Sequence, residues 1–307
     1  MDELMKLFDV QSFLQSLFSK EPVPPKARRK SEARRNPMDV GARPNIPTAV
    51  KAPKLWYVLR RLLIRRGRPY ASAFIDPVSQ RMLLQYLPQG LPDTTGWSAS
   101  QRFDLYSLYV MAYGTTGARI NLSFGQSTIL GLRMVTSTKA NKGLGAFDDR
   151  FVVLWYDWAR NQGEAYEFAG NTEPAWYYDA MNPNAKKIEG QDADGDNKAD
   201  LGRIPVGTFE FRKDNHPKRG NILRPLEPIR LERDTNHDGW FGNDQVDPKH
   251  SNNLYASDTF FHRGGRGGFT GSAGCQTLEG EVFDNFWKAL GSQKKFYYVL
   301  LSVGIRD

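Results

Sequence analysis

Residues 260–278 read FFHRGGRGGFTGSAGCQTL and contain the chain's only cysteine, Cys275. His262, one of four histidines, lies thirteen positions before it, across a glycine-rich stretch. A thiol becomes a strong nucleophile when a nearby base or positive charge promotes the thiolate, and histidine is the usual base because its ordinary pKa lies close to neutrality. The stretch is therefore either a catalytic Cys–His pair or a buried cysteine with an unrelated surface histidine.

The residues beside this pair suit catalysis. The small-residue turn SAG (272–274) leads into Cys275, and such a turn can direct the backbone N–H groups of Gly274 and Cys275 toward an oxyanion. His262 closes the strand-like segment DTFFH, which predicts a rigid support for its side chain. Arg263 follows directly, and its guanidinium is either a contact for a substrate carboxylate or a solvated loop group.

The sequence around this stretch, residues 119–307, is predicted to be mainly β. Strand-like segments bounded by Gly, Asn and Asp occur at 118–125, 128–137, 150–159, 163–170, 203–213 and 294–305. Two helices are expected, one over 281–290 and one over 98–114, with Ser98 or Ser100 as its N-cap and Gly114 as its end. This pattern predicts a mainly β (α+β) fold, either a sandwich or an open barrel, with short helices.

Two of these segments resemble the L,D-transpeptidase catalytic domains of the YkuD type. The stretch SDTFFHRGG…TGSAGCQTL is similar to that family's active-site motif, in which a strand ends in His and a Gly-rich stretch leads to Ser/Thr-x-Gly-Cys. RIPVGTFEF, residues 203–211, resembles the family's upstream TPxGxF strand and lies in the expected order before the histidine. The resemblance covers about residues 119–307 and implies a YkuD-like catalytic domain there.

The resemblance also implies a chemistry. Cys275 would attack a peptide carbonyl in a peptidoglycan stem and form a thioester, with His262 as general base and later acid. Ser272 would shape the turn, and no cofactor would be needed for catalysis. The acyl group would pass to an amine, which makes a cross-link, or to water, which makes the protein a carboxypeptidase or endopeptidase. The candidate substrate-binding residues are Arg263, Gly264 and Gln276.

Two acidic loops suggest structural calcium. The segment DADGDNKAD (192–200) carries carboxylates at its positions 1, 3, 5 and 9, which suits a cation that prefers oxygen ligands, although such loops are also common as plain turns. The segment DTNHDG (234–239) begins like an EF-hand loop. The candidate ligands are Asp192, Asp194, Asp196, Asp200, Asp234, Asn236 and Asp238. The other histidines, His216, His237 and His250, lack zinc-ligand spacing and are expected at the surface.

The basic character of the chain is concentrated in its N-terminal region. The net charge is +8, but residues 1–68 alone hold 16 Lys and Arg against 6 Asp and Glu. Residues 1–53 are predicted to be an amphipathic helix followed by a basic, Pro-rich linker, and residues 54–118 a helical region. The leucine-striped, arginine-flanked helix near residues 54–69 is expected to be a surface helix, a membrane-surface helix or a nucleic-acid contact, and the first of these is favoured.

The composition and the N-terminal sequence bear on the class of protein and on the compartment in which it acts. No apolar run is long enough to span a bilayer, and one cysteine cannot form an internal disulfide. The N-terminus lacks a recognisable secretion signal, so the protein is expected to be made in the cytoplasm and to act in the bacterial periplasm or cell wall. It would then be an antibacterial effector injected by a type VI-like apparatus, with a chaperone or immunity protein as partner, or a phage wall enzyme. The alternatives are a non-catalytic peptidoglycan-binding component of a phage tail or injection apparatus and, less favoured, a nucleic-acid-binding protein.

Overall fold

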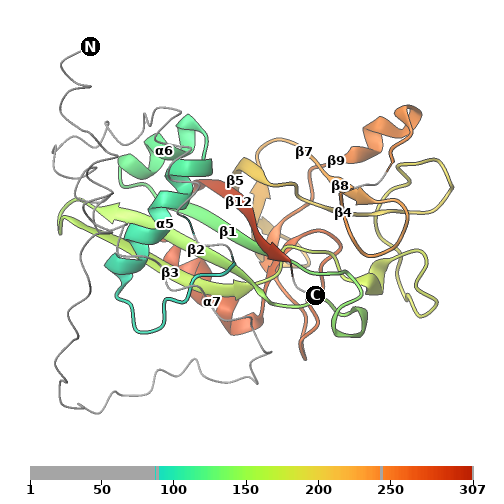
Figure 1. The fold of residues 1–307 in the computed structure, drawn as a ribbon, viewed down its shortest axis with the longest axis horizontal. Helices are drawn as coiled ribbons and strands as arrows, with labels where there is room; N and C mark the ends of the chain where they lie inside the picture. Colours follow the sequence, from blue (N-terminus) through green and yellow to red (C-terminus); the bar gives the residue numbers. More distant parts are fainter. Residues whose placement is uncertain (1–86, 88–89, 243–244, 306–307) are drawn as a thin grey trace, which may run out of the picture. The chain divides into compact units, whose positions relative to one another are not determined.

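The computed structural model describes residues 87, 90–242 and 245–305 of the chain (Figure 1). The amphipathic helix, the basic linker and the basic helix predicted for residues 1–69 all lie outside these residues. Among the described helices, none has both the length and the apolar character needed to cross a bilayer.

Eight strands form one curved, nearly closed sheet, and the described part of the chain is mainly β with a few helices (Figure 1). The order is β11-β10-β6-β5-β12-β1-β2-β3, with β1·β12 and β10·β11 parallel and the other pairs antiparallel. Asn171, just after β3, exchanges two backbone hydrogen bonds with Thr277 of β11, at 2.8 and 2.9 Å, so the two edges of the sheet meet. The strands are β1 (Thr128–Val135), β2 (Asp149–Asp157), β3 (Gln162–Gly170), β5 (Gly207–His216), β6 (Gly220–Pro225), β10 (Phe261–Arg263), β11 (Gln276–Leu278) and β12 (Lys295–Ile305).

Helices cover both faces of this sheet. Leu130 and Leu132 of β1 pack with α5 (Ala99–Tyr113) and α6 (Thr116–Ser123), whereas Ile129 points into a second core with α7 (Gly280–Ala289). Alternate residues of one strand therefore belong to different cores, as the period of two in a strand requires. The second core is aromatic: Phe261 stacks on Phe286, with ring centroids 5.7 Å apart. This core holds β10, the strand that carries His262, against α7.

Smaller elements lie at one end of the sheet. Two short pairs, β4 (Leu201–Arg203) with β8 (Glu232–Asp234) and β7 (Ile229–Arg230) with β9 (Tyr255–Ala256), lie outside the large sheet. Three 3-10 helices complete the described elements, η2 (Asn141–Gly143), η3 (Trp176–Tyr178) and η4 (Pro248–Leu254). These elements carry both acidic loops and part of the surroundings of Cys275.

Most of the predicted elements are confirmed. The helix expected over 98–114 begins after Ser98, whose hydroxyl accepts the Gln101 N–H while the Gln101 side chain accepts the Ser98 N–H, and it is capped by Gly114. Five of the predicted strands and the helix near 281–290 are also present. The strand predicted over 118–125 is wrong, because this segment is α6. Its apolar residues alternate, but Ala118 and Leu122 are the buried ones, and their spacing of four is that of a helix.

Candidate active site

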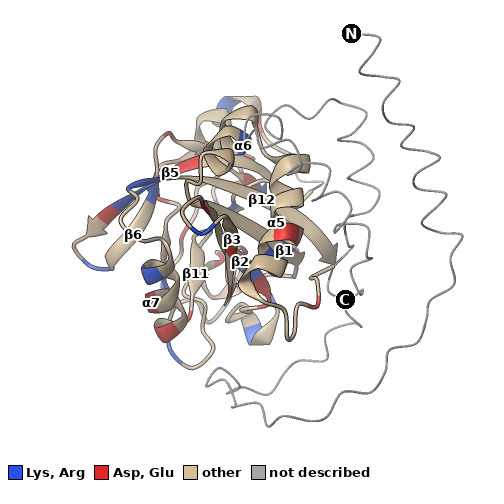
Figure 2. Ribbon diagram, turned by 90° about the vertical axis from the view of Figure 1, so that its left-hand side faces the viewer, with Lys and Arg blue, Asp and Glu red and all other residues tan. Residues whose placement is uncertain are grey.

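Parallel pairing of β10 with β11 brings the cysteine and the histidine together. His262 is paired with Thr277, and the Gln276 N–H donates to the Phe260 carbonyl at 2.8 Å, so Cys275 lies opposite Phe260. Because side chains alternate along a strand, Cys275 and His262 share one face, two residues apart in register. Figure 2 shows β11 and the β5–β6 hairpin, whose Lys and Arg positions appear in blue. In the sheet, β10 lies between β11 and β6.

The His262 ring is held in one tautomer. It is buried, and its Nδ1 lies 2.7 Å from the Arg263 carbonyl oxygen. A carbonyl only accepts, so Nδ1 carries the proton and donates, which leaves Nε2 free to take a proton. The residue after the histidine therefore orients the ring through its backbone.

Arg219, from the turn between β5 and β6, reaches this ring. Its guanidinium nitrogen NH1 lies 3.0 Å from Nε2 and 3.3 Å from Nδ1 of His262. Burial and the positive charge of Arg219 lower the pKa of His262 to about 4, against the smaller opposing effect of the hydrogen bond to Arg263. The imidazole is consequently neutral at pH 7, as a general base must be.

The Cys275 thiol is also neutral in this arrangement. The residue keeps part of its surface accessible, but protein atoms crowd the sulfur, and this burial raises the pKa of Cys275 to about 11. A backbone hydrogen bond from Phe260 and the charge of Arg219 act in the opposite direction. Among the described residues, the Sγ hydrogen bond goes to the Asp258 carbonyl, at 3.5 Å, and not to His262. The structure thus shows a neutral thiol and a neutral imidazole, with no hydrogen bond between them.

The turn before Cys275 is fixed by Ser272 and Gly274. The Ser272 hydroxyl donates to the Cys275 carbonyl at 2.7 Å and accepts the Gly274 N–H at 3.1 Å. Gly274 has φ +126°, and a Cβ there would lie 2.2 Å from the carbonyl oxygen of Gly202, so only glycine fits. The Gly274 N–H, which is predicted to face an oxyanion, donates to Ser272 in this conformation. The Cys275 N–H is among the donors of this turn that no described residue accepts.

The residues predicted to bind substrate have other partners. Arg263 turns its side chain to α7, where it pairs with Asp284 and donates to the Gly280 carbonyl at 3.0 Å. Gln276 is fully buried and accepts the Tyr298 hydroxyl at 2.8 Å. Gly264 supports the fold, since a Cβ there would lie 2.8 Å from the Phe147 ring. The hydrogen bonds of the Arg263 and Gln276 side chains go to groups other than the thiol.

Two groups near the thiol are not predicted from the sequence. Arg219 is an exposed residue of a polar hairpin turn, and nothing in the local sequence relates it to His262, 43 positions later. Tyr178 of η3 has its pKa raised, chiefly by burial, and its ring packs near Phe269 with centroids 5.9 Å apart. The positive charge of Arg219 acts on both Tyr178 and Cys275, so these three groups share one environment.

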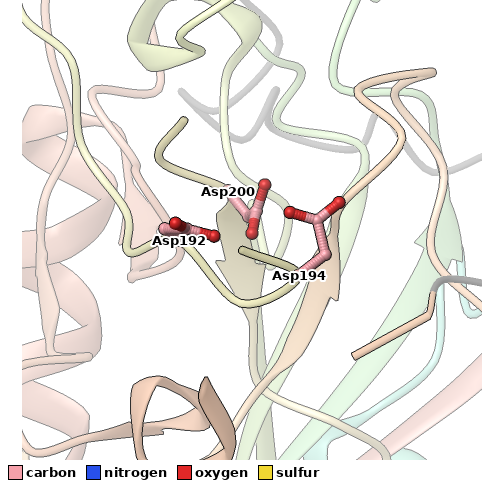
Figure 3. Close-up of side chains that lie close together, drawn as sticks. All are labelled: Asp192, Asp194 and Asp200. Atoms are coloured by element: carbon pink, nitrogen blue, oxygen red, sulfur yellow. The ribbon is translucent and has the colours of Figure 1, made fainter. Parts of the chain in front are cut away.

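The acidic loops are only partly brought together. Carboxylate oxygens of Asp192, Asp194 and Asp200 cluster, whereas Asp196 pairs with Lys198 and leaves the group (Figure 3). In the second loop Asn236 bonds to Asp238 at 3.3 Å. The described residues gather no cluster of three or more His, Cys, Asp or Glu side chains around Asp234 and Asp238, and the second calcium site stays a prediction.

No protein-family model matches the chain, and comparisons with curated proteins and with solved structures give no match either. The resemblance of residues 203–211 and 260–278 to L,D-transpeptidases is therefore a prediction from the sequence.

Proposed function

We propose that this chain is a cysteine acyl-transfer enzyme with a YkuD-like domain that acts on the stem peptides of peptidoglycan. The observation that carries the proposal is the placement of Cys275 and His262 on one face of adjacent parallel strands, with the proton of His262 held on Nδ1 by a carbonyl. The strand of the second motif, β5, lies in the same sheet, separated from β10 only by β6. The substrate class comes from the sequence resemblance.

The reaction would proceed in two balanced steps. The Cys275 proton passes to Nε2 of His262 as Sγ bonds to the carbonyl carbon of a stem peptide. The C–N bond then breaks, the leaving amine takes the proton from His262, and a thioester remains on Cys275. An acceptor amine or water attacks the thioester, His262 takes the acceptor's proton, and the thiol leaves as it regains that proton. The Cys275 N–H would donate to the oxyanion in each step.

Arg219 would control the start of this cycle. Its NH1 group occupies Nε2 of His262, the atom that must receive the thiol proton. A substrate carboxylate is a better partner for a guanidinium than a neutral imidazole, because both groups are charged and the hydrogen bonds are bidentate. Binding of a stem-peptide carboxylate would therefore draw Arg219 away and free Nε2. Arg219 thus replaces Arg263 as the candidate for carboxylate binding.

A second candidate function is supported by the resting state itself. Both the thiol and the imidazole are neutral, and among the described residues no hydrogen bond joins them. A domain that grips peptidoglycan without turnover, as part of a phage tail or injection apparatus, is compatible with this geometry. Binding without a reaction would be the signature of that function.

The test is mass spectrometry of muropeptides after incubation of purified sacculi with the wild type and with Cys275→Ala. We expect thiol-dependent products from the wild type alone. Loss of a terminal D-amino acid would identify a carboxypeptidase, new cross-linked dimers a transpeptidase, and split dimers an endopeptidase. Unchanged muropeptides with both proteins, together with equal binding to sacculi, would reject the enzyme and favour the binding component.

A further inference from the structure

The loop that precedes β4 gathers three carboxylates for which the proposed reaction has no use. One oxygen each of Asp192, Asp194 and Asp200 lies within 4.8 Å of the others, and Figure 3 shows Asp200 between the other two side chains. Oxygen ligands of Ca²⁺ lie about 2.3–2.6 Å from the ion, so two ligands on opposite sides are about 4.6–5.2 Å apart. The separation of these oxygens is therefore small enough for one calcium ion to reach all three.

The buried member of this group has an oxygen without a hydrogen bond. Asp200 is fully buried, and its Oδ2 accepts the Ala193 N–H at 2.6 Å. Its Oδ1 has no hydrogen-bond partner within the described part of the chain. A buried, charged oxygen of this kind is unfavourable unless a cation or a donor meets it.

The nearest ring nitrogen does not supply that donor. His237 is more than nine-tenths buried, which corrects its expected surface position. Its Nδ1 lies 3.1 Å from an oxygen of the buried Asp179, which holds a proton on that nitrogen. Its Nε2 lies 3.6 Å from Asp200 Oδ1, beyond a hydrogen bond, and also has no hydrogen-bond partner among the described residues. Two buried polar atoms thus lie side by side at the edge of the carboxylate cluster.

Nearby basic side chains do little to neutralise the negative charge of the three carboxylates. Lys198 of the same loop pairs with Asp196. Arg233 donates to the backbone carbonyl of Asp200, at 3.1 Å, and not to its carboxylate. Within the residues that the structure describes, His237 is the basic side chain nearest to a carboxylate oxygen of the three. A divalent cation would supply the missing positive charge.

We propose that Asp192, Asp194 and Asp200 bind one calcium ion. The three ligands are hard carboxylate oxygens, and Asp192 and Asp194 are partly exposed, which leaves room for the water ligands that calcium needs to reach six to eight oxygens. The sequence pattern predicts Asp196 as a fourth ligand, but its pairing with Lys198 removes it. The ion would fix the loop that leads into β4, whose Gly202 carbonyl abuts the turn of Cys275. This site is independent of the proposed catalytic function.

The loop offers a matched pair of variants for the test. Asp194 accepts the Asp196 N–H at 3.1 Å, and Asp196 accepts the Lys198 N–H at 2.8 Å. An asparagine keeps each of these hydrogen bonds, so Asp194→Asn and Asp196→Asn change the net charge equally and preserve the local turn. Only Asp194 belongs to the proposed ligand set.

The measurement is isothermal titration of the chelator-treated full chain with CaCl₂, with thermal unfolding in CaCl₂ or MgCl₂ as a second readout. We expect one site per chain, a rise in Tm with calcium, and a smaller rise with magnesium, which demands shorter bonds and octahedral geometry. Asp194→Asn should bind calcium at least about tenfold more weakly, while Asp196→Asn binds like the wild type. Absence of calcium binding by the wild type, or equal loss in both variants, would overturn the site. Tighter binding of magnesium would overturn the assignment to calcium.

Discussion

His262→Gln is expected to lower the rate of product formation from peptidoglycan by about 10²–10⁴-fold. Glutamine can keep hydrogen bonds to the Arg263 carbonyl and to Arg219, but its amide cannot take the thiol proton or return it to the leaving amine. Because a nucleophile and its base act as one unit, loss of the base should approach the effect of losing Cys275. The measurement is the initial rate of muropeptide conversion by the wild type and the variant.

His216→Gln is the matched control. His216 lies at the end of β5, with its ring 5.7 Å from that of Phe260, and it has no place in the proton path. This variant should keep the wild-type rate. A His262→Gln protein that retained most of the activity would contradict the assignment of the base.

The same variant should change the stability of the protein in acid. The pKa of His262 is about 4 in the folded protein and near 6.5 in the unfolded chain, so the unfolded chain takes up the proton first as the pH falls. This group's contribution to stability is complete above pH 6.5 and is lost progressively between pH 6.5 and 4. The wild type should lose up to about 3 kcal/mol more than His262→Gln over this range, measured by urea unfolding.

Glu173→Ala is expected to lower the free energy of unfolding by about 3–5 kcal/mol. Glu173 Oε1 lies 2.8 Å from an Arg203 nitrogen and 3.4 Å from Arg133 Nε, and all three side chains are buried. Alanine would leave two buried guanidinium groups without this counter-charge. Arg133 also donates to the Ile204 carbonyl at 2.7 Å, just before β5, so the damage should spread to the large sheet. Urea unfolding at neutral pH measures the loss.

Glu232→Ala provides the control for this prediction. Glu232 accepts from Arg203 Nε at 2.6 Å, but its side chain is 37% exposed, so solvent screens the pair. Its loss should cost less than about 1 kcal/mol. Equal losses from the two substitutions would show that the buried network is not the stabilising feature.

The sequence predicts local structure here better than it predicts contacts. The α5 helix was predictable because Ser98, Gln101 and Gly114 act within a few residues of one another. The α6 segment was not, because its alternating apolar residues suit a strand, and only tertiary packing selects Ala118 and Leu122 as the buried pair.

In the candidate site, too, the local motifs were predictable from the sequence and the long-range contacts were not. The motif order suggests that Cys275 and His262 meet, but their shared face depends on the parallel register of β10 and β11. Arg219 and Asp284 are partners of His262 and Arg263 across long stretches of sequence, so neither partnership has a local signal. Regular spacing suggested Asp196 as a metal ligand. In the structure its carboxylate instead forms an ion pair with Lys198.

In the proposed reaction, Cys275 carries the acyl group of a stem peptide as a thioester. The most direct measurement is the intact mass of the acid-quenched protein after incubation with a purified stem-peptide muropeptide, followed by peptide mapping. We expect a mass increase equal to the acyl portion, located on the peptide that contains Cys275, released by hydroxylamine and absent from Cys275→Ala. Product formation by Cys275→Ala at the wild-type rate, or an adduct mapped to another residue, would contradict it.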